Sequence, residues 1–225
     1  MMCGMRRAGW ALVGLLAVST LSAGDSKEAK AALKKITAAT KGVQALVADV
    51  EYSETVEKRS TVASGKIYAH FAGFFRVELG GDEPRTILFS YPLLHIHRQA
   101  AQVVEIYDVT LNPDRLGQYL ALGFVPNGNA LRVLYNVQWV ENSILDGRPM
   151  LGFVLTPESE FTARAIARIE LWVDPQSGLP VQHKITHALG AVHLSARYTN
   201  MVRDDGLPAA LFQPDWPAGT VIIRK

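Results

Sequence analysis

Two histidines separated by one residue are the most site-like feature of this 225-residue sequence. In a β-strand, side chains two positions apart point to the same face, so the imidazoles of His95 and His97 can reach one metal ion. The other side chains that such a site would recruit are Glu105 and Asp108, which are nearby in sequence, and His183, His187 and His193 on a C-terminal hairpin. Their spacing fixes no third ligand. We favour the alternative, in which both histidines lie on the solvent face of a strand with Leu94 and Ile96 turned inward, and we predict no metal site.

Motifs of the common catalytic sites do not occur in the sequence. It contains no Gly-x-Ser-x-Gly elbow, no Walker loop, no dinucleotide-binding glycine pattern and no His-Glu-x-x-His. We therefore predict a binding protein without a cofactor, and not an enzyme. A metal-binding protein or hydrolase built on the histidines remains a less favoured alternative.

The first 23 residues have the order of a secretory signal peptide. Arg6 and Arg7 precede an apolar run that begins at Trp10, and small residues follow up to Ala23. We expect cleavage near Ala23, leaving residues 24–225 as one domain. The apolar run is shorter than the roughly 20 residues of a membrane-spanning helix, although an uncleaved anchor is the alternative.

The cysteine content and the charge balance limit the functions that we expect of the mature chain. Its only cysteine is Cys3, inside the predicted leader, so we expect neither a lipid-anchoring cysteine nor a disulfide, and a soluble protein. Loss of Arg6 and Arg7 reduces the 23 basic residues to 21, which equals the number of acidic residues. This balance argues against nucleic-acid binding, which needs a concentrated basic face.

Hydrophobic periodicity indicates which elements hold these residues. Spacings of three and four predict a helix over 26–47, with an apolar face of Ala32, Ile36, Ala39, Val43 and Leu46. From Ala48 onward, alternation with a period of two predicts successive strands separated by turns. An insert at about 112–136 interrupts them, and we interpret it as two short helices. The pattern predicts an α+β, mainly antiparallel β fold, in which a long sheet curls around its apolar face under the helices.

Several short stretches, in order, resemble the LolA-like family of outer-membrane lipoprotein carriers. The most specific is Phe153-Val154-Leu155-Thr156-Pro157 at the end of a strand. Weaker matches are Gly65-Lys66-Ile67-Tyr68, Ile87-Leu88-Phe89-Ser90, Val173-Asp174-Pro175, and the closing segment from Phe212 through Pro217 to Val221. Together they cover nearly all of the predicted mature chain.

The resemblance implies a curled, incomplete β-barrel with an N-terminal helix and a helical lid enclosing a hydrophobic cavity. It also implies a periplasmic monomer that takes lipoprotein acyl chains, or another lipid, from an inner-membrane ABC exporter to an outer-membrane acceptor, without binding nucleotide or nucleic acid. By strand parity the expected cavity residues are Phe75, Val77, Leu79, Ile87, Phe89, Tyr91, Trp139, Phe153, Leu155, Ile169 and Leu171. The expected lid residues are Leu116, Tyr119, Leu120, Leu122, Phe124, Leu131 and Leu134.

One departure from the family pattern concerns the lid. Alignment from Gly65 puts Phe71 where these carriers have an arginine that holds the lid closed, and Arg76 substitutes only if the local turn differs. Divergent relatives of the fold sense lipoproteins, so a lipid- or lipoprotein-sensing module of the RseB type is the alternative function.

Overall fold

One large sheet dominates the protein. The computed structural model describes residues 21–23, 27–111, 132–190 and 192–225. The strands are β1 (Leu21–Ala23), β2 (Ala45–Val56), β3 (Arg59–His70), β4 (Phe74–Leu79), β5 (Arg85–Ser90), β6 (Leu93–Arg98), β7 (Val103–Asp108), β8 (Tyr135–Val140), β9 (Ile144–Leu145), β10 (Arg148–Pro149), β11 (Leu151–Pro157), β12 (Ile166–Val173), β13 (Pro180–His187), β14 (Val192–Arg203) and β15 (Val221–Arg224). The helices are α1 (Lys27–Thr40), α4 (Glu160–Ala163) and the 3-10 turn η1 (Ala209–Phe212).

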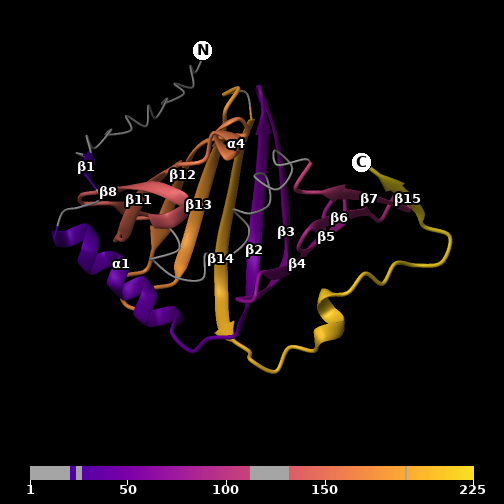
Figure 1. Cartoon of the computed structure of the whole chain (residues 1–225), viewed down its shortest axis with the longest axis horizontal. Helices are drawn as coiled ribbons and strands as arrows, with labels where there is room; N and C mark the ends of the chain where they lie inside the picture. The colour runs from indigo at the N-terminus through magenta and orange to yellow at the C-terminus, as the bar shows by residue number, and fades with distance from the viewer. Residues whose placement is uncertain (1–20, 24–26, 112–131, 191) are drawn as a thin grey trace, which may run out of the picture.

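The sheet is curled and unclosed. Its strands are hydrogen-bonded in the order β1-β8-β11-β12-β13-β14-β2-β3-β4-β5-β6-β7-β15, while β9 and β10 form a separate hairpin. Neighbours pair antiparallel except β15, which runs parallel to β7. The long strands β2 and β14 stand in the middle, and α1 lies on the side of β8 and β11–β13 (Figure 1). The predicted fold, a mainly antiparallel incomplete barrel with an N-terminal helix, is confirmed.

Helix α1 is shorter than predicted. Ala29, Ala32, Leu33 and Ile36 are buried on one face, as the periodicity indicates. The helix ends at Thr40, because Gly42 adopts a left-handed conformation at φ 73° and turns the chain into β2. The expected continuation to residue 47 is therefore wrong, and Leu46 is buried as part of a strand.

Two other predicted segments lie largely outside the described residues. Residues 112–131 of the insert are not described, whereas 132–134 are helical and Tyr135 already belongs to β8. The expected boundary at 136 is thus two residues late.

Of the predicted leader only Leu21–Ala23 is described, and it pairs with β8 so that Ser22 lies opposite Trp139. Cleavage near Ala23 remains a prediction. No helix among the described residues is both long and apolar enough to cross a membrane.

The sheet buries a continuous apolar cluster on one side, which we call the inner face. Cross-strand register aligns Ile67, Val77, Ile87 and Ile96 on this face over four neighbouring strands. The same cluster includes Ala32, Leu33 and Ile36 of α1, so the helix packs on the inner face. Strands β3 and β4 approach closely at Gly65, where a Cβ would meet the Glu78 carbonyl oxygen at 1.7 Å.

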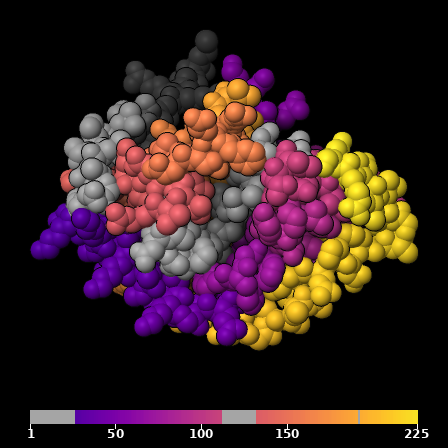
Figure 2. Space-filling model, in the orientation of Figure 1, coloured from indigo at the N-terminus to yellow at the C-terminus, as the bar shows by residue number. Residues whose placement is uncertain are grey.

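The opposite, outer face of β4–β6 is covered by the C-terminal segment, residues 204–225. Phe212 packs its ring against Phe74 at 6.1 Å between centroids, and Trp216 lies against His97 at 5.1 Å. The segment runs along the side of the molecule formed by β4–β7 and ends in β15 (Figure 2). It thereby buries a sheet face that would otherwise meet water.

Candidate functional site

Most of the expected cavity residues converge on the inner face. Those buried within its apolar cluster are Phe75, Val77, Leu79, Ile87, Phe89, Phe153, Leu155 and Ile169. Trp139 and Leu171 are partly buried and pack against the same cluster. Strand parity therefore identified which side chains share this face. Their role as the lining of a lipid cavity remains a prediction.

Aromatic pairs reinforce both halves of this face. Phe75 and Phe89 lie opposite each other on β4 and β5, stacked with centroids 5.3 Å apart. In the other half, Trp139 meets Phe153 edge to face at 5.4 Å across β8 and β11. Each ring pair is worth about 0.5–1.5 kcal/mol beyond its buried area. The inner face is thus apolar and aromatic at both sides of the curl.

Tyr91 does not join the cluster. It lies beyond the end of β5, in the turn formed with Pro92, and its side chain is 69% exposed. The alternation that places Ile87 and Phe89 inward ends with the strand, because a turn no longer directs side chains to alternate faces. Tyr91 is correspondingly separate from the other expected cavity residues.

The expected lid falls mainly outside the described residues. Leu116, Tyr119, Leu120, Leu122, Phe124 and Leu131 belong to this undescribed part. Leu134 is described and is 54% exposed, and its carbonyl oxygen accepts a hydrogen bond from the Glu158 amide at 3.1 Å. Leu134 therefore belongs to the short segment that joins the insert to β8.

Arg76, the alternative to the lid arginine of LolA-like carriers, contacts the C-terminal segment. It lies on the outer face, where its Nε donates to Glu78 Oε1 at 2.7 Å and its Nη1 to the Leu211 carbonyl oxygen at 3.4 Å. Arg76 thus holds the C-terminal segment, on the side of the sheet away from α1. Phe71 follows β3, and its amide donates to the Gln44 carbonyl oxygen at 2.8 Å.

The histidines and carboxylates of the metal hypothesis are not brought together. Leu94 and Ile96 are turned inward as expected, but His95 and His97 are buried under Trp216 and do not face solvent. Burial lowers the pKa of both imidazoles, with a further contribution from Arg224 at His95 and from Arg76 at His97. Within the described ranges, no three His, Cys, Asp or Glu side chains are grouped so as to hold a metal ion.

Glu105 and Asp108 have other partners. Glu105 pairs with Arg98 at 3.3 Å, and its register partner is Ile96, which places it on the inner face away from both histidines. Asp108 accepts hydrogen bonds from the amide and hydroxyl of Thr110, which lower the pKa of its carboxyl group. Both carboxylates therefore serve local structure.

The inner face also holds a buried polar pair that the sequence does not predict. His183 lies in register with Leu171 and Ala196, and its Nδ1 is 3.1 Å from the hydroxyl of Tyr198. Burial lowers the pKa of His183 to about 3 and raises that of Tyr198. The imidazole is therefore neutral at any physiological pH. Both residues belong to alternating strands, but nothing in the sequence shows that they meet.

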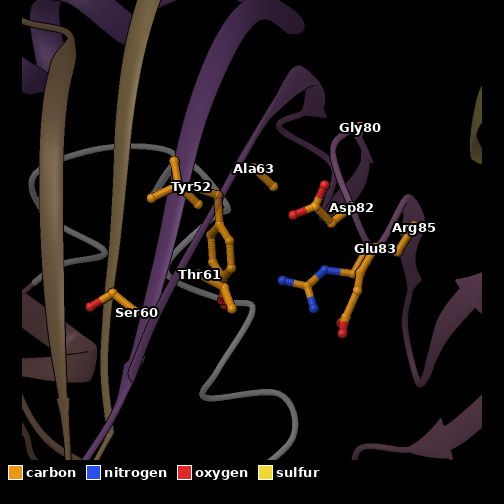
Figure 3. Close-up of a pocket in the computed structure, with 9 residues that line it drawn as sticks. Tyr52, Ser60, Thr61, Ala63, Gly80, Asp82, Glu83 and Arg85 are labelled. Atoms are coloured by element: carbon orange, nitrogen blue, oxygen red, sulfur yellow. The ribbon is translucent and has the colours of Figure 1, made fainter. Parts of the chain in front are cut away.

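A pocket of about 270 Å³ opens where the β2–β3 hairpin extends beyond the β4–β5 turn (Figure 3). Its lining residues are Tyr52, Ser60, Thr61, Val62, Ala63, Gly80, Asp82, Glu83 and Arg85. The Arg85 guanidinium carbon lies 5.1 Å from the centroid of the Tyr52 ring, and one Nη is 3.8 Å from a Glu54 carboxylate oxygen. Tyr52 also belongs to the apolar cluster, so the pocket borders the inner face.

Comparisons with known proteins find similarity in structure only. The sequence matches no family model, and no curated protein matches it. An uncharacterised conserved protein from Thermus thermophilus superposes with a TM-score of 0.54 at 12% identity, covering 88% of this chain and all of that one. MucB gives 0.51 at 15% identity, covering 88% of this chain and 66% of its own. A LolA superfamily protein from Nitrosomonas europaea gives 0.45 at 12%, covering 82% and 97%.

These likenesses concern the fold. At such identities, the superpositions above a TM-score of 0.5 show the same chain architecture and carry no site from one protein to another. The protein shares with these two structures the architecture of a curled, unclosed antiparallel sheet.

Proposed function

We propose that this protein is a periplasmic carrier of the LolA type, which shelters acyl chains against the inner face of its sheet. In this proposal it receives lipoproteins, or another lipid, from an inner-membrane ABC exporter and delivers them to an outer-membrane acceptor. It works as an exported monomer and performs no bond chemistry.

The observation that carries the proposal is the continuity of the apolar inner face. Buried apolar side chains extend across it from Val137 on β8 to Tyr107 on β7, with aromatic pairs on both sides of the curl. Among the described helices, α1 alone contributes to this cluster. Such a continuous apolar face, within a sheet that does not close, is the environment that a hydrocarbon chain needs.

The energetics match the task of a carrier. Burial of one methylene group is worth about 0.8 kcal/mol, so a saturated acyl chain of sixteen carbons gains roughly 12 kcal/mol on leaving water. A lipid can therefore leave its membrane readily only if the protein offers its acyl chains an equally apolar environment. The two aromatic pairs and the surrounding aliphatic side chains of the inner face offer that environment without a covalent step.

Native mass spectrometry of the protein purified from periplasm tests the proposal. We expect a fraction of the protein to carry a mass corresponding to one or more acylated molecules, which is removed by mild delipidation. Protein that is always free of lipid, both as purified and after incubation with vesicles, would contradict lipid binding. Correct placement of outer-membrane lipoproteins in cells depleted of the protein would contradict the sorting role alone.

A second candidate is a lipid- or lipoprotein-sensing module that binds a regulatory partner. The superposition on MucB, a protein also solved in complex with MucA, favours this candidate over an enzyme. Affinity purification from periplasm distinguishes the two: a stable protein partner in equal amount supports sensing, whereas exporter-dependent loading with lipoprotein supports transport.

A further inference from the structure

Arg85 is the one arginine that lines the pocket beside Tyr52. It begins β5 and lies opposite Leu79 in register, which places it on the inner face at the end of β4. Strand β3 pairs with β4 only as far as Gly65 but continues to Arg59 alongside β2. The pocket occupies this step, between the free half of β3 and the β4–β5 turn, and Figure 3 shows the guanidinium group facing the Tyr52 ring.

The guanidinium group of Arg85 has unused hydrogen-bonding capacity. Its side chain is 12% exposed, and its Nε is buried without an acceptor among the described residues. The ion pair with Glu54, at 3.8 Å, is too long for a strong hydrogen bond. A buried donor without an acceptor costs roughly 1–3 kcal/mol. An anionic group entering the pocket would satisfy it with the bidentate geometry that guanidinium favours.

The pocket also offers negative charge at its solvent side. Asp82 and Glu83 line it from the β4–β5 turn, and both are exposed. A lone anion would be repelled by these two carboxylates. A head that carries an anionic group together with an ammonium group would satisfy Arg85 inside and the carboxylates outside.

The buried apolar cluster begins at the pocket, since Tyr52 belongs to both. Tyr52 contacts the Arg85 guanidinium with its ring and is 3% exposed within the apolar cluster, and Leu79 and Ile87 continue the same face. We propose that this pocket binds the zwitterionic head of a phospholipid, phosphate against Arg85 and primary ammonium against Asp82 and Glu83, while the acyl chains follow the inner face. The inference rests on the proposed carrier function and names the class of its cargo.

Competition between lipids of equal chains tests the inference. Delipidated full-length protein is incubated with vesicles of dioleoyl phosphatidylethanolamine, dioleoyl phosphatidylglycerol and dioleoylglycerol in equal amounts, and the bound lipids are quantified by mass spectrometry. We expect the order phosphatidylethanolamine, phosphatidylglycerol, diacylglycerol. The chain-free head, glycerophosphoethanolamine, should not displace the lipid at equal concentration.

Substitutions in the pocket test which side chains bind the phosphate and which bind the ammonium group. Arg85→Gln should reduce the preference for phosphatidylethanolamine over diacylglycerol about tenfold, the loss expected for one charge-assisted contact. The double variant Asp82→Asn, Glu83→Gln changes only exposed side chains and should reduce the preference for phosphatidylethanolamine over phosphatidylglycerol about two- to fivefold. Arg98→Gln is the matched control: this arginine lies opposite Arg85 in register but is paired with Glu105 at 3.3 Å, and the preference should not change.

The possible failures are distinct. If the wild-type protein takes up none of the three lipids, the head site is wrong, and if it also carries no acylated molecule as purified, the carrier proposal fails with it. If it takes up all three equally, or if the preference survives in both pocket variants, the head site is wrong and the carrier proposal stands. An equal loss in Arg98→Gln would likewise overturn the head site, because the effect would then come from the general charge of the face. Displacement by the chain-free head would overturn it in favour of a site for soluble zwitterions.

Discussion

A buried imidazole shows how one residue couples this fold to pH. His183 is enclosed with Tyr198 on the inner face, and its pKa of about 3 is far below the ordinary value of 6.5. Above pH 6.5 the imidazole is neutral in the folded and unfolded states and contributes no pH dependence. As the pH falls below 6.5, His183 of the unfolded chain binds a proton that the folded protein does not bind. The free energy of unfolding therefore decreases toward pH 3.

We predict that His183→Asn removes part of this acid sensitivity. An asparagine can place a polar atom near the position of the imidazole Nδ1 and keep a hydrogen bond to the Tyr198 hydroxyl. Between pH 6 and pH 4 the free energy of unfolding of the wild-type protein should fall more steeply than that of the variant, by up to about 1.4 kcal/mol per pH unit. Urea unfolding at several pH values measures both slopes.

His95 and His97 serve as the internal reference for this comparison. The pKa of each is also lowered by burial, so they contribute acid sensitivity of the same sign to both proteins. The difference between the two slopes therefore isolates His183. Equal slopes would mean that His183 is as accessible to protons in the folded state as in the unfolded chain.

At the scale of elements, the C-terminal segment decides whether the outer face of β4–β6 meets water. Trp216 contacts both His95 and His97, with ring centroids 5.9 and 5.1 Å apart, and β15 then pairs with β7. The first hydrogen bond of that pairing joins the Val221 amide to the Gln102 carbonyl oxygen at 2.8 Å. The four residues of β15 are exposed, so side-chain burial adds little to its attachment.

Trp216→Ala should therefore release β15 without unfolding the sheet. We expect faster amide hydrogen exchange at Val221–Arg224 and a loss of about 1–3 kcal/mol in the free energy of unfolding, less than for a fully buried tryptophan because Trp216 is partly exposed. Trp172→Ala is the matched control, since Trp172 is also partly exposed but lies on β12, where it contacts Lys184. Unchanged exchange at β15 in Trp216→Ala would show that the strand is held independently of this ring.

For the whole molecule, the central property is the apolar inner face enclosed by an unclosed sheet. A ligand that binds only the folded protein raises its apparent stability by an amount set by ligand concentration and affinity. A lipid on the inner face would contact both halves of the curl and so stabilise the molecule as a unit.

We predict that a bound phospholipid raises the free energy of unfolding of the delipidated protein by about 2.7 kcal/mol when present at one hundred times its Kd. Chemical denaturation with increasing lipid, at a fixed detergent concentration, measures the increment. Phe153→Asp places a carboxylate within the cluster beside Trp139, so it should abolish the increment as well as reduce basal stability. Stabilisation by detergent alone, without further effect of lipid, would contradict the prediction.

Local patterns in the sequence predicted much of this architecture. The alternation through Phe75 and Val77, and through Ile87 and Phe89, placed these side chains correctly on one face, because a strand directs alternate residues to opposite sides wherever it pairs. The same rule failed at Tyr91, where the strand has already ended. The predicted helix is too long because Val43 and Leu46 continue its apolar spacing by coincidence, past the left-handed Gly42.

Residues close together in the chain were sufficient to predict most of the elements, their apolar faces and the resemblance to LolA-like carriers. Which distant residues meet depends on the folded molecule: Trp216 over the two histidines, Tyr198 beside His183, and Arg85 across the end of β4 against Tyr52. Those contacts follow from the order and register in which strands pair. Hydrophobic alternation is compatible with many such orders, because it specifies which side of a strand is apolar and not which neighbour covers it.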